Sequence, residues 1–523
     1  MERTRNTTAP CLAILGTGSD VGKSVVVTAL CRIFGNRGRC VAPFKAQNMS
    51  NNSFVTPEGG EMGRAQVVQA EAARVKPHTD MNPVLLKPCA DTGAQVVVHG
   101  KPWSEGRSVG DQPDGGILSA ESRRALDRLR KTYDLIVMEG AGSCAEINLR
   151  DRDFANFRMA EAADAPVILV ADIDRGGVFG QIIGTLAVLQ PEERLRIKGV
   201  IINRFRGDAK LFRDGTAFIE DQIQRPVLGL IPFFYHIDID SEDGMTLESL
   251  IDPAEGPALD KINIAVIRLP HISNFTDFAP LQREPAVQLQ HYLTRPRSLG
   301  GYDLVLLPGS KNVRADMAWL RERGWEAAVQ NFAEAGGRIG GICGGYQLLG
   351  HAICDPLGVE GPPGNTAGLN LLPVSTKLNN KKTLTRCQGT WKSNDCVVTG
   401  YEIHMGQTEW TAELEPVIQM TNRDGESMSV PEGALSPCGR LWGTYLHGLF
   451  DLTPFRQSFL RDLAPDRMDP ATPPAGESEE GFKDAQYELL AAHFEAHLDM
   501  PAILGLGGQA FDRITEPSTT VGP

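Results

Sequence analysis

With 523 residues the chain is too long for one hydrophobic core, so we expect two or three domains. A hydrophobic fraction of 41% and a charged fraction of 22% are ordinary for a globular protein, and the net charge of −13 argues against a broad surface for nucleic acid or anionic membrane. The polar start predicts that no signal peptide is present, and no apolar stretch is long enough to span a membrane. The ten cysteines include no Cys-x-x-Cys pair, so we expect a cytoplasmic protein with free thiols.

The first predicted unit is a strand at 11–15, a glycine-rich turn at 16–24 and a helix that continues to residue 34. Backbone N–H groups of such a turn and the positive end of the helix dipole bind phosphate oxygens. Lys23 is then expected to reach the β- and γ-phosphates of a nucleotide, and Ser24 to ligate Mg²⁺. Thr17 replaces the first glycine of the Walker A pattern. The residues predicted to contact the nucleotide here are Thr17, Gly18, Val21, Gly22, Lys23 and Ser24.

A second strand is predicted at 40–44, followed by Lys45 and by a polar loop that contains Gln47 and Asn48. Open α/β sheets bind ligands at the carboxyl ends of their strands, so this loop is a candidate for binding a polar substrate. A solvated turn is an equally good interpretation, because Asn and Ser favour turns. The next segment, 61–74, has helical spacing, and its polar residues face either a ligand or water.

Two further buried strands are predicted at 133–139 and 166–172, and both end in a carboxylate. The first strand resembles a Walker B strand, so we favour Glu139 as a ligand of Mg²⁺ over Glu139 as a helix cap. For Asp172, which ends the second strand, both interpretations stay open.

A strand at 199–202 runs into Asn203, which stands where several P-loop proteins read the nucleotide base, although the lysine of that motif is Arg204 here. Buried strands thus alternate with helical stretches, which predicts an α/β fold with a parallel sheet wrapped by helices. The pattern fades in an acidic segment punctuated by Pro and Gly and then starts again, so we expect two doubly wound domains. The predicted division is a P-loop domain at 1–240, a linker at 241–261, a second α/β domain at 262–455, and a Pro-rich stretch with a C-terminal helix at 456–523.

The second domain contains a glycine-rich stretch, 337–345, in which Cys343 stands between a predicted strand and a predicted helix. Gly-x-Cys-x-Gly in this context is the nucleophile elbow, with cysteine in place of serine. The helix N-terminus behind Cys343 favours the thiolate. Backbone N–H groups at Gly344 and at the turn around Gly309 are expected to stabilise an oxyanion.

A cysteine nucleophile needs a base, and two histidines of the second domain follow strand-like patterns. His447 ends the apolar pattern at 441–447, and His404 follows a shorter one at 401–403. The residues alone favour His447 and leave His404 as the second candidate. A helix expected at 479–498 carries an apolar stripe, packs on the body of the protein and suggests no chemistry.

A cysteine elbow and a downstream histidine on an α/β domain, joined to a P-loop domain, resemble a class I glutamine amidotransferase fused to an ATP-dependent acceptor domain. Within that class the chain resembles the glutamine-hydrolysing cobyric acid synthases over nearly its whole length. The stretches that carry this are Pro-Phe-Lys-Ala-Gln-Asn-Met-Ser-Asn-Asn at 43–52, Met-Asn-Pro-Val-Leu-Leu-Lys-Pro at 81–88, Tyr-Glu-Ile-His-Met-Gly at 401–406 and Leu-His-Gly at 446–448. The P-loop half is similar to dethiobiotin synthetase, which shares the Thr-for-Gly change and the Glu-Gly-Ala-Gly strand end, here at 139–142.

The resemblance implies that ATP and glutamine amidate the b, d, e and g carboxylates of a corrinoid, adenosylcobyrinic acid a,c-diamide, to give adenosylcobyric acid in cobalamin biosynthesis. It implies ATP and Mg²⁺ as cofactors, with no nucleic-acid or membrane partner. Cys343 would form the γ-glutamyl thioester and His447 would be its base, while His404 takes a structural or glutamine-site role. Ordinary class I amidotransferases have a Glu at the position of Leu449 in this chain. The cobyric and cobyrinic subgroup also lacks this Glu, so the group that orients His447 is not identified.

Other functions remain as alternatives. A cobyrinic acid a,c-diamide synthase would run the same chemistry on the free acid, but the loop at 47–50 speaks against it. A partition-type P-loop ATPase, or an interaction protein with an inactive amidotransferase fold, leaves Cys343 and His447 unexplained. Since the two sites lie on separate domains, we predict a covered route for ammonia between Cys343 and the P-loop.

Overall fold

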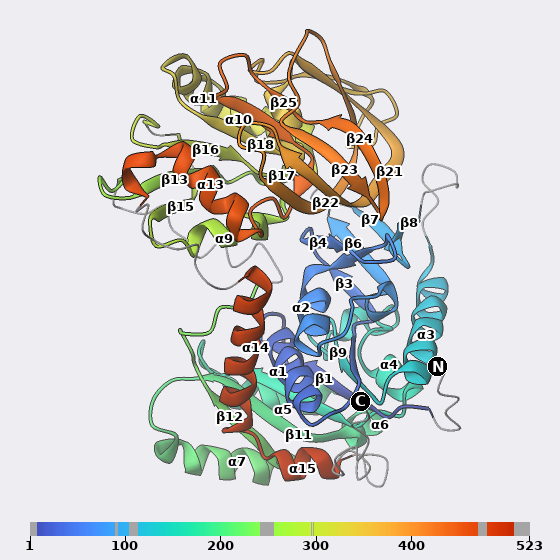
Figure 1. Cartoon of the computed structure of the whole chain (residues 1–523). Helices are drawn as coiled ribbons and strands as arrows, with labels where there is room; N and C mark the ends of the chain where they lie inside the picture. Colours follow the sequence, from blue (N-terminus) through green and yellow to red (C-terminus); the bar gives the residue numbers. More distant parts are fainter. Residues whose placement is uncertain are drawn as a thin grey trace, which may run out of the picture.

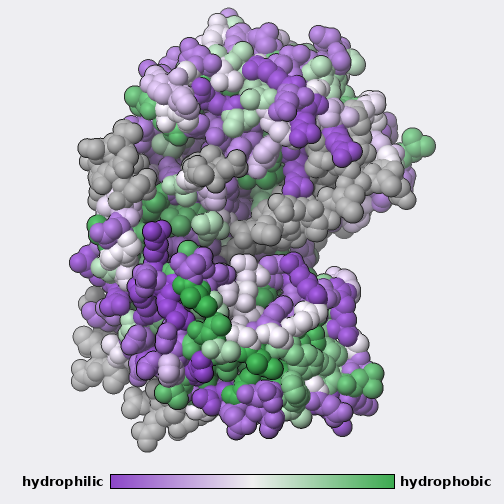
Figure 2. Space-filling view, turned by 180° about the vertical axis from the view of Figure 1, so that it is seen from behind, coloured by the Kyte–Doolittle hydropathy of each residue, from purple (hydrophilic) through white to green (hydrophobic). Residues whose placement is uncertain are grey.

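The computed structural model describes residues 8–88, 93–103, 113–240, 256–293, 295–296, 298–468 and 478–506, which form two α/β halves, one above the other in Figure 1. Most of the linker predicted at 241–261 lies outside these residues, and so do residues 469–477 of the Pro-rich stretch. None of the described helices combines the length and the apolarity that crossing a membrane requires. Seen from behind, the first half carries a group of apolar side chains, whereas the second half is mostly hydrophilic (Figure 2).

The first half is built on a six-stranded parallel sheet with the strand order β12-β11-β10-β1-β9-β2. Its strands are almost continuously apolar because helices cover both faces of the sheet. The strands are β1 Cys11–Gly16, β2 Val41–Phe44, β9 Leu135–Glu139, β10 Val167–Asp172, β11 Ile197–Phe205 and β12 Val227–Pro232. The helices of this half are α1 Lys23–Asn36, α2 Arg64–Ala72, α3 Gly115–Thr132, α4 Phe157–Ala162, α5 Val178–Val188, α6 Pro191–Arg196 and α7 Arg213–Ile223, with short 3-10 turns η1 Thr79–Met81, η2 Ile147–Leu149 and η3 Ala209–Phe212. This confirms the α/β prediction for the first half.

Small strands above this sheet form the side of the first half that faces the second half (Figure 1). Four strands pair in the order β3-β6-β7-β8, and β4 pairs with β5. They are β3 Gln47–Met49, β4 Ser53–Val55, β5 Glu61–Gly63, β6 Val84–Pro88, β7 Ala94–Val98 and β8 Lys101–Pro102. The helical prediction for 61–74 was therefore wrong at its start, because residues 61–63 pair with β4 and the helix begins only at Arg64.

The second half also has a six-stranded sheet, in the order β15-β13-β16-β18-β26-β25. All its pairs are parallel except that of the edge strand β25. The strands are β13 Ile262–Ile267, β15 Val287–Leu293, β16 Leu304–Leu307, β18 Ile339–Ile342, β25 Ala434–Leu435 and β26 Leu441–Thr444. The helices are α9 Ala279–Gln282, α10 Val313–Glu322, α11 Trp325–Glu334, α12 Gly344–Leu349 and α13 Thr453–Leu463, with 3-10 turns η4 Phe275–Phe278 and η5 Pro465–Arg467.

A second, largely antiparallel sheet in this half was not predicted from the sequence. It is dominated by the long hairpin of β21 and β22, both of which contact β4 of the first half. Its strands are β19 Ala352–Asp355, β20 Gly364–Ala367, β21 Val374–Trp391, β22 Val397–Trp410, β23 Ile418–Arg423, β24 Glu426–Glu432 and β27 Leu446–His447. A two-residue pair, β14 Ile272–Ser273 with β17 Gly309–Ser310, lies apart from both sheets.

The C-terminal helices return to the first half. Helix α14, Glu479–Glu495, packs against α1, and α15, Met500–Gly505, lies beside β12 (Figure 1). Leu490, Phe494 and Leu498 of the predicted apolar stripe are buried in the core beneath α1, so this part packs on the body of the protein as predicted, whereas Leu489 is exposed.

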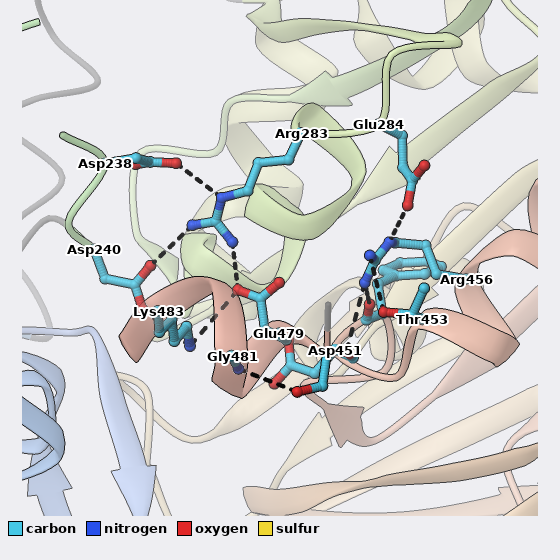
Figure 3. A network of polar contacts seen from close by, with 12 residues as sticks. Asp238, Asp240, Arg283, Glu284, Asp451, Thr453, Arg456, Glu479, Gly481 and Lys483 are labelled. Carbon is cyan, nitrogen blue, oxygen red and sulfur yellow. Dashed lines mark hydrogen bonds and ion pairs between the residues drawn. The ribbon is translucent and has the colours of Figure 1, made fainter. Parts of the chain in front are cut away.

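A network of charged side chains, of which Asp238 is exposed and the others are largely buried, joins the two halves and the C-terminal helix (Figure 3). Arg283, at the end of α9, pairs with Asp238, with Asp240 and with Glu479 of α14. Asp240 also lies 2.8 Å from the Arg64 guanidinium of the first half. Because the loss of one partner would leave a buried charge uncompensated, this network fixes the halves relative to each other.

Candidate functional site

Cys343 lies in a sharp turn between β18 and α12, with φ 53° and ψ −107°. This conformation disfavours side chains, and it is maintained by close packing of the neighbouring glycines. A Cβ atom on Gly345 would lie 2.0 Å from the Leu307 carbonyl oxygen, and one on Gly341 would lie 2.6 Å from the Gly345 backbone. The glycines on both sides of Cys343 are therefore needed for the turn to pack against β16.

His447 lies beside Cys343 and is held by a carboxylate. Its Nδ1 lies 2.7 Å from Asp277 Oδ2, and the other oxygen of Asp277 accepts a hydrogen bond from the Gly448 N–H at 3.0 Å. Burial alone would lower the pKa of His447, but the Asp277 carboxylate and a hydrogen bond to Cys343 raise the pKa to about 10. The imidazolium form is thus favoured next to the thiol.

Asp277 is a site residue that sequence reasoning missed. It lies on η4, 170 residues before His447, and it is one of 65 acidic residues in the chain. No fixed spacing connects it to His447, because η4 follows β13 and β14 whereas His447 belongs to β27 in another sheet. The only local signal is a carboxylate between two phenylalanines, a position at which an unpaired charge would be costly to bury.

The pattern around the two histidines was interpreted partly incorrectly. The apolar stretch predicted as one strand from 441 to 447 is broken, since β26 ends at Thr444 and β27 pairs with β22 in the antiparallel sheet. His404 does not follow a strand end but lies within β22, where its ring stacks on Tyr445 at 3.8 Å. Burial lowers the pKa of His404 to about 4, so this histidine is neutral.

The predicted oxyanion glycines lie beside the elbow. A Cβ atom on Gly309 would lie 3.2 Å from the His447 ring, and one on Gly344 would lie 2.6 Å from the Ser310 backbone nitrogen. The Gly309 backbone therefore lies close to the His447 ring, and Gly344 packs against Ser310, the residue after Gly309. Such an arrangement can present N–H groups to a developing oxyanion.

A cavity of about 90 Å³ adjoins this centre and extends across the boundary between the halves. Cys343, Gln347, His404 and His447 line it from the second half. Lys87 and Gln95 come from β6 and β7 of the first half. Further lining residues include Lys311, Glu360 and Lys382.

The glycine-rich turn of the first half opens into α1 as predicted. Gly22 precedes the helix with φ 93°, a left-handed conformation that favours glycine. The Lys23 ammonium donates to the Gly18 and Gly142 carbonyls at 2.9 and 2.8 Å. Asn203 is buried and donates to the Val21 carbonyl at 3.0 Å, so it contacts the turn directly.

Ser24 and Glu139 lie together at the end of the sheet. The Ser24 hydroxyl donates to Glu139 at 2.9 Å, and the same carboxylate contacts Lys45 at 2.8 Å and Gln69 at 2.5 Å. Of the two orientations left open for the polar residues of α2, toward a ligand site or toward water, Gln69 therefore has the first. Among the described residues no three His, Cys, Asp or Glu side chains form a metal cluster. A hydroxyl and one carboxylate still fit Mg²⁺, which in nucleotide sites completes its shell with phosphate oxygens and water.

Asp172, for which two roles were open, belongs to a different set of contacts. One of its oxygens accepts the Asp174 N–H at 2.7 Å, and the other lies 2.9 Å from the Arg204 guanidinium. Arg204 also pairs with Asp20 of the glycine-rich turn. Asp172 therefore holds Arg204 and the turn that follows β10.

The polar loop after β2 connects the two centres. Lys45 contacts Glu139, Gln47 lies in β3, and Asn48 is buried and donates to Gln66 at 2.9 Å. Further along, the Tyr401 hydroxyl donates to the Ser53 carbonyl at 3.3 Å. Since the Tyr401 ring stacks on His447, the loop spans from the carboxylate of one centre to the histidine of the other.

Comparisons with known proteins agree with this two-centre arrangement. Residues 12–247 match the CobQ/CobB/MinD/ParA nucleotide binding domain, and residues 263–455 match the CobB/CobQ-like glutamine amidotransferase domain. The chain is 55% identical to the cobyric acid synthase of Pelodictyon phaeoclathratiforme, covering 94% of this chain and 96% of that protein. It is 53% identical to that of Chlorobaculum tepidum, covering 95% and 98%, and 46% identical to that of Chloroflexus aurantiacus, also covering 95% and 98%.

Proposed function

This chain belongs to the cobyric acid synthase family, and we propose that its second half releases ammonia from glutamine at Cys343 while its first half uses ATP to activate corrinoid carboxylates. As a member it is a glutamine-hydrolysing ligase that makes cobyric acid in cobalamin biosynthesis. The alternatives of a cobyrinic acid diamide synthase and a partition-type ATPase are not favoured by relatives of this identity over the whole chain. The b, d, e and g carboxylates as acceptors are part of the proposal.

The glutaminase step rests on the buried contacts of Cys343, His447 and Asp277. The Cys343 thiolate attacks the amide carbon of glutamine, and N–H groups near Gly309 and Gly344 stabilise the oxyanion. The His447 imidazolium gives its proton to the leaving nitrogen, so ammonia departs and a γ-glutamyl thioester remains. Water then attacks the thioester with His447 as base, which releases glutamate and regenerates the thiol. Asp277 keeps the His447 ring in the tautomer that both steps require.

The synthetase step solves a leaving-group problem. Hydroxide leaves a carboxylate poorly, so a corrinoid carboxylate first takes the γ-phosphoryl group of ATP, giving an acyl phosphate and ADP. Ammonia then displaces phosphate and forms the amide. Lys23 and the N–H groups of the turn hold the phosphates and offset their charge, and Asn203 contributes to nucleotide binding. Ser24 and Glu139 would hold Mg²⁺, which supplies further positive charge to the phosphates when bound.

The cavity at Cys343 supports a covered passage for ammonia. Since Lys87 and Gln95 of the first half line it, the space beside the thiol already borders the synthetase half. Free ammonia is mostly protonated at neutral pH and then unreactive, so a shielded passage keeps it nucleophilic. The loop that contains Lys45, Gln47 and Asn48 lies between the two centres and is the proposed binding segment for the corrinoid.

Replacement of Cys343 by Ala tests this division of labour. We expect Cys343→Ala to abolish glutamine-driven synthesis and glutamate release, and to retain amidation driven by ammonium salts. Cys354→Ala, which removes another thiol of the same half, serves as the matched control and should keep both activities. Mass analysis of the product should show four added amides on the a,c-diamide. The proposal would be contradicted if Cys343→Ala lost both activities while Cys354→Ala kept them. It would also be contradicted if the product were cobyrinic acid with two added amides.

A further inference from the structure

A segment of the first half reaches the glutaminase centre of the second half. Strand β4, which begins at Ser53, contacts β22, and β22 carries Tyr401 opposite His447 (Figure 1). The Tyr401 ring stacks on the His447 ring, with 5.5 Å between the ring centroids and 24° between the ring planes. The steps proposed above give no role to Ser53 or Tyr401.

Three residues form a closed ring of hydrogen bonds at this contact. The Ser53 N–H donates to Asn274 Oδ1 at 3.2 Å, and Asn274 Nδ2 donates to the Tyr401 hydroxyl at 3.3 Å. The Tyr401 hydroxyl in turn donates to the Ser53 carbonyl at 3.3 Å. Burial raises the pKa of Tyr401 well above its usual range, so the hydroxyl keeps the proton that it donates. Because each residue donates to the next one around the ring, the three bonds polarise and strengthen one another.

Asn274 occupies the junction between two parts of the glutaminase centre. It precedes η4 with φ 51° and ψ 40°, a left-handed conformation that Asn adopts more readily than most residues. One residue earlier, Ser273 pairs with Gly309 of the proposed oxyanion turn. Three residues later, the Asp277 N–H donates to the Asn274 carbonyl at 3.1 Å, and the Asp277 carboxylate holds His447. A displacement of Asn274 would therefore be transmitted to both parts.

Charged groups of the first half fix the position of Ser53. Its side chain is fully buried, and its hydroxyl donates to Glu61 at 2.8 Å and accepts from the Lys87 ammonium at 2.7 Å. Asn274 and Tyr401 are also buried, with exposed fractions of 3% and 5%. Since water does not reach these groups freely, opening the ring would leave buried donors and acceptors without partners.

We infer that the Ser53 peptide of the first half completes the glutaminase centre of the second half. Through the ring, Asn274 positions the carboxylate that orients the base, and Tyr401 positions the base itself. The inference rests on the proposed glutaminase function and adds that the second half does not hold its base alone. Ammonia is then formed efficiently only while the two halves are docked, when the covered passage can receive it.

The test measures ammonia release from glutamine and ammonium-driven synthesis on the same samples of the full chain. Asn274→Gly removes the side chain and keeps a residue that accepts the left-handed backbone, while Tyr401→Phe removes only the hydroxyl. We expect each variant to lower kcat for ammonia release about 3- to 10-fold, the usual effect of one or two neutral hydrogen bonds. KM for glutamine should stay within about twofold of the wild type, because the ring acts on the base.

Two comparisons separate positioning from a general loss of structure. The ratio of ammonia release to ammonium-driven synthesis should fall by the same factor as kcat, and partial unfolding of a sample does not change this ratio. The double variant Asn274→Gly, Tyr401→Phe should lose about as much as the more affected single variant, because either change opens the ring.

Two further variants are matched controls. Asn370→Gly makes the same change at an exposed residue of the second half with a similar left-handed backbone, φ 58°. Arg386→Met removes a contact between the halves outside the ring, since the Arg386 guanidinium lies over the Phe54 ring at 5.9 Å. Both controls should keep the wild-type kcat and KM.

Several outcomes would overturn the inference while the role of Cys343 stands. Asn274→Gly and Tyr401→Phe could keep kcat within twofold, or they could raise KM at unchanged kcat, which would place the ring in substrate binding. Arg386→Met could lose as much as they do, which would mean that the ring only joins the halves. The double variant could lose the product of the two single losses, which would show independent roles. If instead the wild type releases no ammonia from glutamine, the proposed function itself fails.

Discussion

Asp277→Asn is the most informative single change for the glutaminase centre, because it keeps the shape of the side chain and removes only its charge. Asp277 accepts two hydrogen bonds, from His447 Nδ1 at 2.7 Å and from the Gly448 N–H at 3.0 Å. An amide has one acceptor oxygen and so satisfies only one of these buried donors. If its NH₂ group faces His447, Nδ1 must act as acceptor, the proton moves to the other ring nitrogen, and the ring can no longer take a proton from Cys343.

The expected loss follows from the strength of the contact. A hydrogen bond to a charged group contributes about 1.5–3 kcal/mol, and full burial of both partners places this one at the upper end. About 3 kcal/mol corresponds to a loss of about 100-fold in kcat/KM for glutamine. Synthesis driven by ammonium salts does not use His447, so we expect it to change little in Asp277→Asn.

The pH dependence gives an independent measurement. Burial favours neutral His447, and the raised pKa of about 10 depends on Asp277 and Cys343. Without the Asp277 charge the pKa of His447 falls, so the alkaline limb of kcat/KM moves to lower pH. Glu284→Gln is the matched control, since it neutralises a buried carboxylate that pairs with Arg456 at 2.6 Å outside the cavity. A loss below about fivefold in Asp277→Asn, or an unshifted alkaline limb, would refute the role given to Asp277.

Three further changes address other parts of the molecule. Glu139→Gln should abolish amidation with either glutamine or ammonia, while ammonia release from glutamine persists; retained amidation would contradict the metal role. Gly345→Ala should destroy glutaminase activity, because the added methyl would lie 2.0 Å from the Leu307 oxygen; normal kcat would show that the turn can relax. Glu61→Gln should lower the free energy of unfolding by about 3 kcal/mol in urea titrations at pH 7, since it leaves Lys87 and Lys382 buried without an anion. Burial alone would raise the pKa of Glu61, but these lysines hold it below its usual 4.5. The difference in free energy of unfolding between the wild type and Glu61→Gln should therefore vanish as pH falls well below 4.5. A difference that stays constant with pH would contradict the ion-pair explanation.

Several tertiary features departed from the sequence predictions for identifiable reasons. The segment 61–63 has helical spacing, but it pairs with β4, and in this position Glu61 contacts Lys382 of the second half. The stretch that leads to His447 looks like one strand, yet it changes sheets after Thr444. In both places a contact with a distant segment overrides the local pattern, which a periodicity argument does not contain.

The sequence by itself determined the two α/β sheets, the phosphate-binding turn before Lys23 and the elbow at Cys343. Each of these is a strand, a turn and a helix in succession, so backbone geometry and the helix dipole act within a few neighbouring residues. Only the tertiary structure decided which charges meet: Asp277 with His447, and Glu61 with Lys382. Those pairs are set by strand order and by the packing of one half on the other, and the energy of a buried charge depends on neighbours in space rather than on neighbours along the chain.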